Sequence, residues 1–164
     1  KLAAEQYCAV YSRLFGLQYV GLRFGNVYGP RQNPNGEAGV VAIFANQMLQ
    51  NKAISIHGTG KQTKDYIFIS DAIEAAMKAF HQNVTGVVNI GTGKETSVLE
   101  IFSVLKKFTG YGAKAKHVPL PAIGFPRGSL AIQKAKKELG WQPKVDLQEG
   151  LQTTVQWFQS LSRS

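Results

Sequence analysis

Residues 22–32 read Leu-Arg-Phe-Gly-Asn-Val-Tyr-Gly-Pro-Arg-Gln, and the local pattern of the chain changes within this stretch. Apolar residues lead into it as far as Phe24, which is typical of a β-strand. The glycine, asparagine and proline residues that follow predict a loop. Because open α/β sheets bind ligands where such strands end, we expect the residues after Phe24 to border a binding site.

The segment before this stretch is predicted to form a helix and then a strand. Strong helix formers run from Lys1 to Leu14 without an N-cap residue, and Gly16 ends the helix. Residues 17–24 are expected to form a strand that is buried in a parallel sheet.

The segment after it alternates helical and strand-like patterns, which predicts an α/β fold. Helices are expected over residues 40–48, 71–80, 98–108, 133–139 and 147–158, and strands over 54–56, 66–69, 86–90 and 114–118. Expected N-cap residues, each followed by a glutamate three positions later, are Asp71 (or its neighbour Ser70), Ser97 and Asp146. The core face of the helix over 40–48 is expected to hold Val40, Ile43, Phe44 and Met48. The apolar stripe of the helix over 71–80 is Ile73, Ala76, Met77 and Phe80.

Composition limits the class of protein. The 164 residues are 44% hydrophobic, enough for one compact domain. Neither an apolar run of about 20 residues nor a signal peptide is visible, so we expect a cytoplasmic protein without a membrane partner. The single cysteine, Cys8, falls in a helical pattern and is expected to pack as a small apolar group. Because the sequence has no Cys/His cluster, we expect no metal site.

The basic charge has two interpretations. The net charge is +9 and the pI is about 9.7, which could indicate a polyanion-binding surface. However, the basic residues are spread along the chain, and the densest groups, 106–107 and 134–137, lie on predicted helices beside apolar residues. Solvated helix faces are therefore favoured over a nucleic-acid partner, although a few of these charges could serve one diphosphate.

A glycine-rich turn at 91–93, Gly-Thr-Gly, follows a predicted strand and precedes a helix. This arrangement is reminiscent of a dinucleotide-binding turn. The third glycine is missing, and no acidic residue ends a following strand about 20 residues later. We therefore interpret it as a structural turn.

Four stretches, in this order, resemble the nucleotide-sugar epimerase/dehydratase branch of the extended short-chain dehydrogenases, and within it the UDP-glucose 4-epimerases. The stretch at 22–32 is the first, and the loop and helix over 33–44 are the second. Residues 58–71 are similar to the pattern G-D-G-x-Q-x-R-D-Y-I-x-V-x-D, and Leu-Gly-Trp-Gln-Pro at 139–143 is similar to a tail signature. The family's enzymes interconvert nucleotide sugars by transient hydride transfer to NAD.

The resemblance implies that the chain is the C-terminal portion of such an enzyme. Residues 1–26 would be the last helix and strand of the NAD-binding Rossmann domain, and 27–164 the substrate domain. Lys1 would be the lysine of the catalytic Tyr-Lys pair and would contact NAD, and Phe24 would lie near the nicotinamide. Since neither the tyrosine nor the cofactor motif is in these residues, the chain alone is expected to be inactive.

The resemblance also implies contacts with a UDP-hexose substrate. The implied substrate-binding residues are Asn26, Gly39, Val40, Ile56, His57, Lys64 and Arg127. Lys64 stands where the family has an arginine that binds the diphosphate, and Arg127 is a candidate for a second such arginine, although the R-x-G-D pattern is not kept around it. Taken alone, Asn26 could be a loop residue, His57 a structural histidine and Lys64 a solvated charge.

Two further expectations concern partners and alternatives. The family's helix corresponding to residues 1–14 lies in a four-helix bundle, which implies a homodimer. A related NAD(P)-dependent dehydratase or reductase is the neighbouring alternative to an epimerase. A stand-alone module that binds anions or nucleic acid is the alternative of another class.

Overall fold

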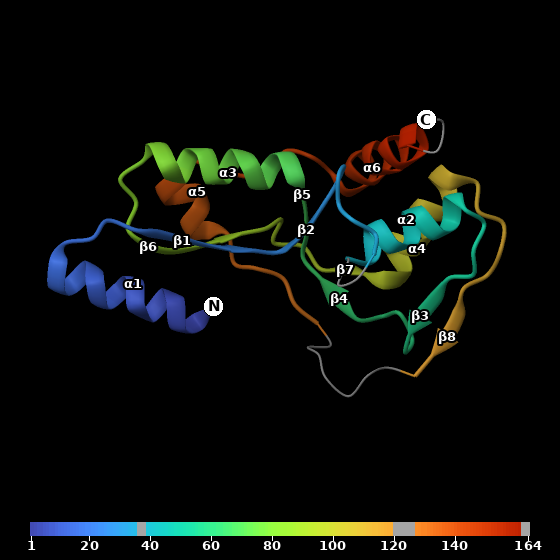
Figure 1. The fold of residues 1–164 in the computed structure, drawn as a ribbon, viewed down its shortest axis with the longest axis horizontal. Helices are drawn as coiled ribbons and strands as arrows, with labels where there is room; N and C mark the ends of the chain where they lie inside the picture. Colours follow the sequence, from blue (N-terminus) through green and yellow to red (C-terminus); the bar gives the residue numbers. More distant parts are fainter. Residues whose placement is uncertain (36–38, 120–126, 162–164) are drawn as a thin grey trace.

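The computed structural model describes residues 1–35, 39–119 and 127–161. Over these ranges the chain forms an α/β fold, as the sequence predicts (Figure 1). The helices are α1 (Leu2–Phe15), α2 (Val40–Leu49), α3 (Ile69–His81), α4 (Val98–Thr109), α5 (Gln133–Leu139) and α6 (Leu147–Leu161). The strands are β1 (Val20–Phe24), β2 (Asn26–Tyr28), β3 (Ser55–His57), β4 (Thr63–Lys64), β5 (Tyr66–Phe68), β6 (Gly86–Ile90), β7 (Thr96–Ser97) and β8 (Lys116–Val118).

The strands associate in pairs that join distant parts of the chain. β1 pairs with β6, β2 with β5, and β3 with β8, all in parallel. β4 and β7 form an antiparallel pair. Parallel pairing needs long crossover connections, and the helices supply them.

Figure 1 shows these elements gathered in two bodies. The first body contains α1, α3 and α5 with the β1–β6 pair, and the second contains α2, α4 and α6 with the β3–β8 and β4–β7 pairs. The β2–β5 pair lies between them. Because β6 pairs with β1, residues 86–90 lie beside residues 20–24 although they are far along the chain. The division at residue 26 stays a prediction about the whole protein.

The second body has a closed hydrophobic core. α2 is buried on most sides, α4 contributes Ile101 and Leu105, and α6 contributes Leu151, Val155 and Phe158. The predicted core face of α2 is confirmed, because Phe44 and Met48 belong to the core and the half-buried Val40 and Ile43 pack against it. The buried residues of α2 are Val41, Ala42, Phe44, Ala45 and Met48.

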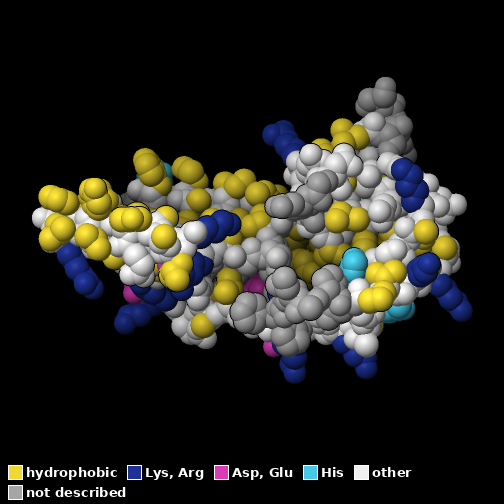
Figure 2. All heavy atoms as spheres, turned by 60° about the horizontal axis from the view of Figure 1, so that its bottom comes forward, with side chains coloured by type: hydrophobic (Ala, Val, Ile, Leu, Met, Phe, Trp, Pro, Cys, Tyr) yellow, Lys and Arg dark blue, Asp and Glu magenta, His cyan; other side chains and the backbone are white. Residues whose placement is uncertain are grey.

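The first body leaves much apolar surface open. α1 has no buried residue, and β1, which begins at Val20, is half-buried or exposed along its length. Among the described strands β1 has β6 as its neighbour and pairs with it in parallel, so the burial of β1 in a larger sheet stays a prediction about the whole protein. The apolar stripe of α3 faces outward, while Ala72, Ala75 and Ala79 face inward. Figure 2 shows the hydrophobic side chains that gather over this body.

Two of the three predicted N-caps are confirmed. The Ser97 hydroxyl accepts a hydrogen bond from the Glu100 N–H at 3.1 Å, and the Asp146 carboxylate accepts one from the Glu149 N–H at 2.9 Å. The prediction for α3 was wrong, because this helix begins at Ile69 without a side-chain cap.

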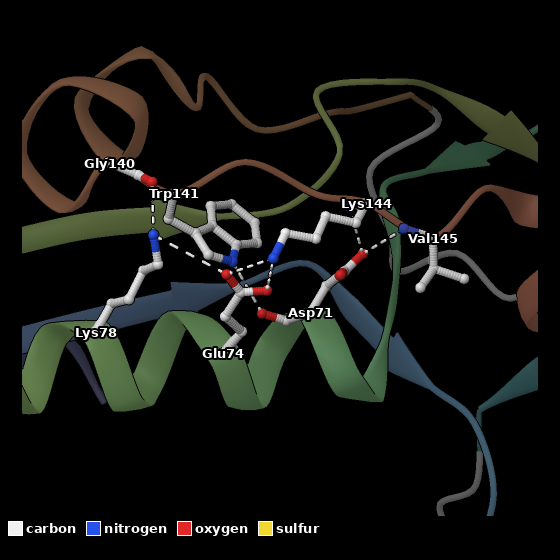
Figure 3. Close-up of polar contacts among 7 residues, drawn as sticks. All are labelled: Asp71, Glu74, Lys78, Gly140, Trp141, Lys144 and Val145. Atoms are coloured by element: carbon white, nitrogen blue, oxygen red, sulfur yellow. Dashed lines mark hydrogen bonds and ion pairs between the residues drawn. The ribbon is translucent and has the colours of Figure 1, made fainter.

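Asp71 binds the connection between α5 and α6 instead (Figure 3). Its buried carboxylate accepts hydrogen bonds from the N–H groups of Lys144 and Val145, and its carbonyl accepts one from the Trp141 indole. Glu74, one turn further along α3, pairs with Lys144 at 2.8 Å. The Trp141 indole and the Gly140 carbonyl, which accepts from Lys78 at 2.7 Å, join the tail signature at 139–143 to α3, so that signature has a structural role.

Candidate functional site

A cavity of about 300 Å³, here called the Lys64 cavity, opens where β1 passes into β2. It brings together four predicted site residues that are far apart in sequence, namely Phe24, Asn26, Lys64 and Arg127. Its remaining lining residues are Gly25, Asp65, Gly128, Ser129 and Leu130. Two cationic side chains and one amide therefore face the same space, which suits an anionic ligand.

Asp65 holds the walls of this cavity together. It is only 4% exposed, and its carboxylate accepts four hydrogen bonds. Oδ1 accepts from the N–H and hydroxyl of Thr92, both at 2.7 Å, and Oδ2 accepts from the N–H groups of Gly93 at 2.9 Å and Leu130 at 3.0 Å. A buried carboxylate needs such donors, because an unpaired one is costly.

The backbone of Asp65 also fixes Asn26. The Asp65 carbonyl accepts from the Asn26 N–H at 2.7 Å and from its side-chain amide at 3.4 Å. A Cβ on Gly25 would lie 2.9 Å from the same carbonyl oxygen, so this close approach requires glycine. One residue thus positions the start of β2, the turn after β6 and the segment at 128–130.

The glycine-rich turn at 91–93 is confirmed as structural. Its backbone N–H groups already bind the Asp65 carboxylate, and a Cβ on Gly91 would lie 2.6 Å from Asp65 Oδ2. A dinucleotide pyrophosphate would need the same donors. The turn therefore does not fit NAD, and the predicted cofactor contacts Lys1 and Phe24 lie elsewhere, at the N-terminus of α1 and on β1.

Arg127 is oriented by a neighbouring carboxylate. Its Nε donates to Glu95 Oε2 at 2.9 Å, and the Thr63 hydroxyl donates to the same oxygen at 2.8 Å. The hydrogen bond from Thr63 and that from the Arg127 guanidinium lower the pKa of the Glu95 carboxyl. Glu95 is therefore ionised at neutral pH and attracts Arg127.

A second cavity of about 400 Å³, here called the His57 cavity, lies between α2 and β3. It collects three predicted site residues, namely Val40, Ile56 and His57. The His57 Nδ1 lies 3.3 Å from the Pro119 carbonyl, and the His57 carbonyl accepts from the Gln62 side chain at 2.9 Å. With an imidazole and apolar side chains, this cavity suits a flat ring with polar edges.

The two cavities are close neighbours. Gln62 lines the His57 cavity and Lys64 lines the Lys64 cavity, and only Thr63 separates these two residues. Two residues of extended chain span about 7 Å, which is the scale of one ribose unit. The arrangement can therefore hold a ring in one cavity and attached phosphates in the other.

Lys1 and Gly39 lie in neither cavity. Lys1 is exposed at the N-terminus of α1, and Gly39 is exposed at the N-terminus of α2. Arg23 donates to Glu5 at 2.9 Å, which holds the first turn of α1 against the carboxyl end of β1. Lys1 and Phe24 therefore belong to the same edge of the first body.

A larger cavity of about 640 Å³ contains none of the predicted site residues. Tyr28 and Tyr66 line it from β2 and β5, and Glu95 reaches it from the turn before β7. Burial raises the pKa of both phenols, that of Tyr66 to about 12.

In the described ranges no group of three or more His, Cys, Asp or Glu side chains could hold a metal ion. Among these residues, too, no helix is long and apolar enough to cross a membrane.

Three residues that shape the site were not predicted from the sequence. Asp65 and Gln62 belong to the quoted motif at 58–71, and Glu95 follows the glycine-rich turn. An aspartate between a strand-end lysine and an apolar run could have been recognised as an anchor, since a buried carboxylate needs several donors. Nothing in the local sequence links Glu95 to Arg127, which is 32 positions away.

The known proteins that this chain resembles are enzymes named for UDP-sugars. The chain is 39% identical over 165 residues to UDP-glucose 4-epimerase of Mycolicibacterium smegmatis, covering 99% of this chain and 52% of the relative. It is 33% identical over 168 residues to UDP-N-acetyl-alpha-D-glucosaminuronate decarboxylase of Bacillus cytotoxicus, covering 98% and 52%. The crystal structure of UDP-glucose 4-epimerase with UDP-glucose from Thermotoga maritima superposes with a TM-score of 0.97 at 42% identity, covering 99% and 52%.

The chain spans about half the length of the relatives it matches. The profile of the NAD dependent epimerase/dehydratase family matches residues 1–91, which contain α1, the β1–β6 pair and most of the Lys64 cavity. From this match and the shared fold, the chain belongs to the NAD-dependent epimerase/dehydratase family.

Proposed function

We propose that the whole protein is a UDP-hexose 4-epimerase and that this chain supplies its UDP-sugar-binding part. The observation that carries the proposal is the pair of neighbouring cavities, which collect Asn26, Lys64 and Arg127 on one side of Thr63 and His57 on the other. The relatives named above act on UDP-sugars, which supports the same substrate class here.

The proposed binding mode follows from charge and shape. The diphosphate lies in the Lys64 cavity, where Lys64 and Arg127 offer positive charge and Asn26 offers an amide. The uracil lies in the His57 cavity against the imidazole and beside Ile56 and Val40. Gly39, which precedes Val40 and lies outside this cavity, is proposed to contact the nucleotide through its backbone. Lysine is a compact charge rather than a planar fork, so Lys64 binds phosphate with looser geometry than arginine.

The proposed chemistry requires residues outside this chain. NAD, when bound, accepts a hydride from the sugar and returns it. Lys1 is proposed to lower the pKa of a tyrosine from outside this chain and to hydrogen-bond the nicotinamide ribose, while Phe24 packs near the nicotinamide. The contact between Arg23 and Glu5 supports this role, because it holds the turn that follows Lys1 beside the end of β1.

A homodimer is proposed from the exposed face of α1. Tyr11 and Phe15 are 53% and 72% exposed, and their rings contact each other in a tilted arrangement with centroids 5.3 Å apart. Such a stripe on a helix is suited to a bundle with the same helix of another copy. Sedimentation of the full-length protein with Tyr11→Glu is expected to give monomers, and an unchanged dimer would contradict this interface.

The binding proposal is tested by titrating UDP-glucose into the full-length natural protein that contains this chain. Lys64→Ala is expected to weaken binding about 10-fold, which corresponds to about 1.4 kcal/mol, and Lys64→Arg is expected to retain or improve it. Lys61→Ala is the matched control, because Lys61 lies three positions away and lines neither cavity. Equal effects of Lys64→Ala and Lys61→Ala would contradict the proposed phosphate site.

A further inference from the structure

The Arg127 side chain is 75% exposed, yet its position is defined by a specific contact. Its Nε donates to Glu95 Oε2, and a free arginine of this exposure would sample many rotamers. The contact uses only the inner nitrogen of the guanidinium. In the part of the chain that the structure describes, the two terminal nitrogens make no hydrogen bond with another residue.

Glu95 is itself held in place. The Thr63 hydroxyl donates to the same Oε2 at 2.8 Å, and the Gly128 N–H approaches the Thr63 hydroxyl oxygen at 3.4 Å. Because Gly128 follows Arg127 directly, the contacts form a closed ring through Arg127, Gly128, Thr63 and Glu95. The ring joins β4, the turn before β7 and the segment that carries Arg127.

Glu95 and Arg127 face different spaces. Arg127 and Gly128 line the Lys64 cavity, whereas Glu95 lines the larger cavity that contains Tyr28 and Tyr66. The carboxylate therefore contacts the guanidinium from outside the Lys64 cavity and is not one of the groups that a ligand there would meet. A carboxylate placed in this way orients an arginine rather than competing with the anion for it.

We propose that Glu95, held by Thr63, is a positioning residue that presents the terminal nitrogens of Arg127 to a diphosphate in the Lys64 cavity. The inference rests on the proposed function, because it takes a diphosphate as the ligand. Planar guanidinium nitrogens bind phosphate oxygens in pairs, so orientation matters more for arginine than for a point charge. Holding the side chain in advance also reduces the entropy lost on binding.

The first arm of the test needs no ligand. Nitrogen-15 NMR of arginine-labelled full-length protein follows hydrogen exchange at Arg127 Nε. Exchange is expected to be slowed in the unaltered protein and in Glu95→Gln, which keeps an acceptor oxygen, and to become fast in Glu95→Ala. Equal exchange in the unaltered protein and Glu95→Ala would overturn the positioning role.

The second arm is a double-mutant cycle with UDP-glucose. Arg127→Ala is expected to weaken binding about 10-fold, Glu95→Ala about 5-fold, and the double variant no more than Arg127→Ala alone. Glu95→Gln is expected to retain binding within about 2-fold, a rescue that mere loss of stability would not give. Glu138→Ala, which removes a similarly exposed carboxylate from the Lys134 ion pair, is the matched control.

The outcomes separate the two proposals. Unchanged or tighter binding by Glu95→Ala would show that Glu95 is neutral or competes for Arg127, and would overturn the inference alone. Additive losses in the double variant would do the same, because they mean independent roles. Failure of the unaltered protein to bind UDP-glucose would instead contradict the proposed function.

Discussion

α6 and α1 are helices of nearly equal length, with 15 and 14 residues, but they differ in what surrounds them. α6 buries Leu151, Val155 and Phe158 against α2 and α4, whereas α1 buries no residue. Both carry apolar side chains at helical spacing, so sequence pattern alone does not explain the difference. The partners that surround a helix decide which of its apolar side chains are buried.

The same contrast holds for the two bodies as wholes. The second body contains a closed core around α2, α4 and α6, and the cavities proposed for UDP lie at its edge. The first body exposes apolar side chains on α1 and α3. The relatives are about twice as long as this chain, and we propose that in a protein of their length further residues cover the outer face of α3.

The largest expected effect is in the core of the second body. Leu151 is fully buried, so Leu151→Ala leaves a cavity and is expected to lower the free energy of unfolding by about 2–5 kcal/mol. Leu14→Ala is the matched control on α1, where Leu14 is 68% exposed, and is expected to change it by less than about 0.5 kcal/mol. Denaturant unfolding of the 164-residue chain measures both free energies. Similar losses in the two variants would contradict the difference in burial between α6 and α1.

Asp65→Asn is expected to have the next largest effect, because Asp65 joins the β2–β5 pair to the turn after β6. An asparagine amide nitrogen cannot accept, so two of the four hydrogen bonds are lost and two donors are left unpaired. We expect a loss of about 2–4 kcal/mol in the free energy of unfolding.

The control for this variant is Asp146→Asn, at an exposed N-cap where both residues serve equally well. Asp146→Asn is expected to leave the free energy of unfolding nearly unchanged in the same denaturation experiment. Equal stability of Asp65→Asn and Asp146→Asn would mean that Asp65 does not hold the cavity walls together.

A moderate effect is expected at alkaline pH. Burial raises the pKa of Tyr66 from 10.0 to about 12, because the phenolate would lose its hydration, so ionisation of Tyr66 destabilises the folded state. This destabilisation is absent below pH 10 and grows as the pH rises toward 12, to a total of about 2–3 kcal/mol. Tyr66→Phe is expected to flatten the decline in unfolding free energy over this window. Tyr7→Phe, on the exposed face of α1, is the control, and an equal flattening by it would contradict the assignment.

The smallest expected effect is on the outer face of α3. Phe80 is 81% exposed, so Phe80→Glu is expected to change the unfolding free energy of this chain by less than about 0.5 kcal/mol. In the full-length protein the same substitution is expected to cost more, because a charge would be buried beneath the proposed covering part. Equal effects in the two proteins would mean that this face stays uncovered.

Local patterns predicted most of the secondary structure. Gly16 and Gly140 end α1 and α5 in left-handed conformations, as expected, and α5 and β6 have the predicted bounds. The two-residue strands β4 and β7 were not predicted, because they exist only through pairing with each other. The cap of α3 was wrong because Asp71 finds better donors in the distant backbone at 144–145.

The candidate site was predicted through resemblance rather than through local pattern. Phe24, Asn26, Lys64 and Arg127 do line one cavity, and Val40, Ile56 and His57 line its neighbour, although their roles stay predictions. The residues that hold the first cavity together were not foreseen. Asp65 reaches donors 27 to 65 positions away, and no local pattern contains that information.

The sequence by itself determined where the helices and most of the strands form, because helical periodicity, capping residues and glycine turns act over a few neighbouring residues. The stretch at 22–32 marked the end of a strand and the border of a cavity in this way. Only the tertiary structure decided which apolar faces are buried, and that the glycine-rich turn at 91–93 binds Asp65. Burial and hydrogen bonding depend on contacts between residues that are far apart in the sequence, and these contacts form only when the chain folds.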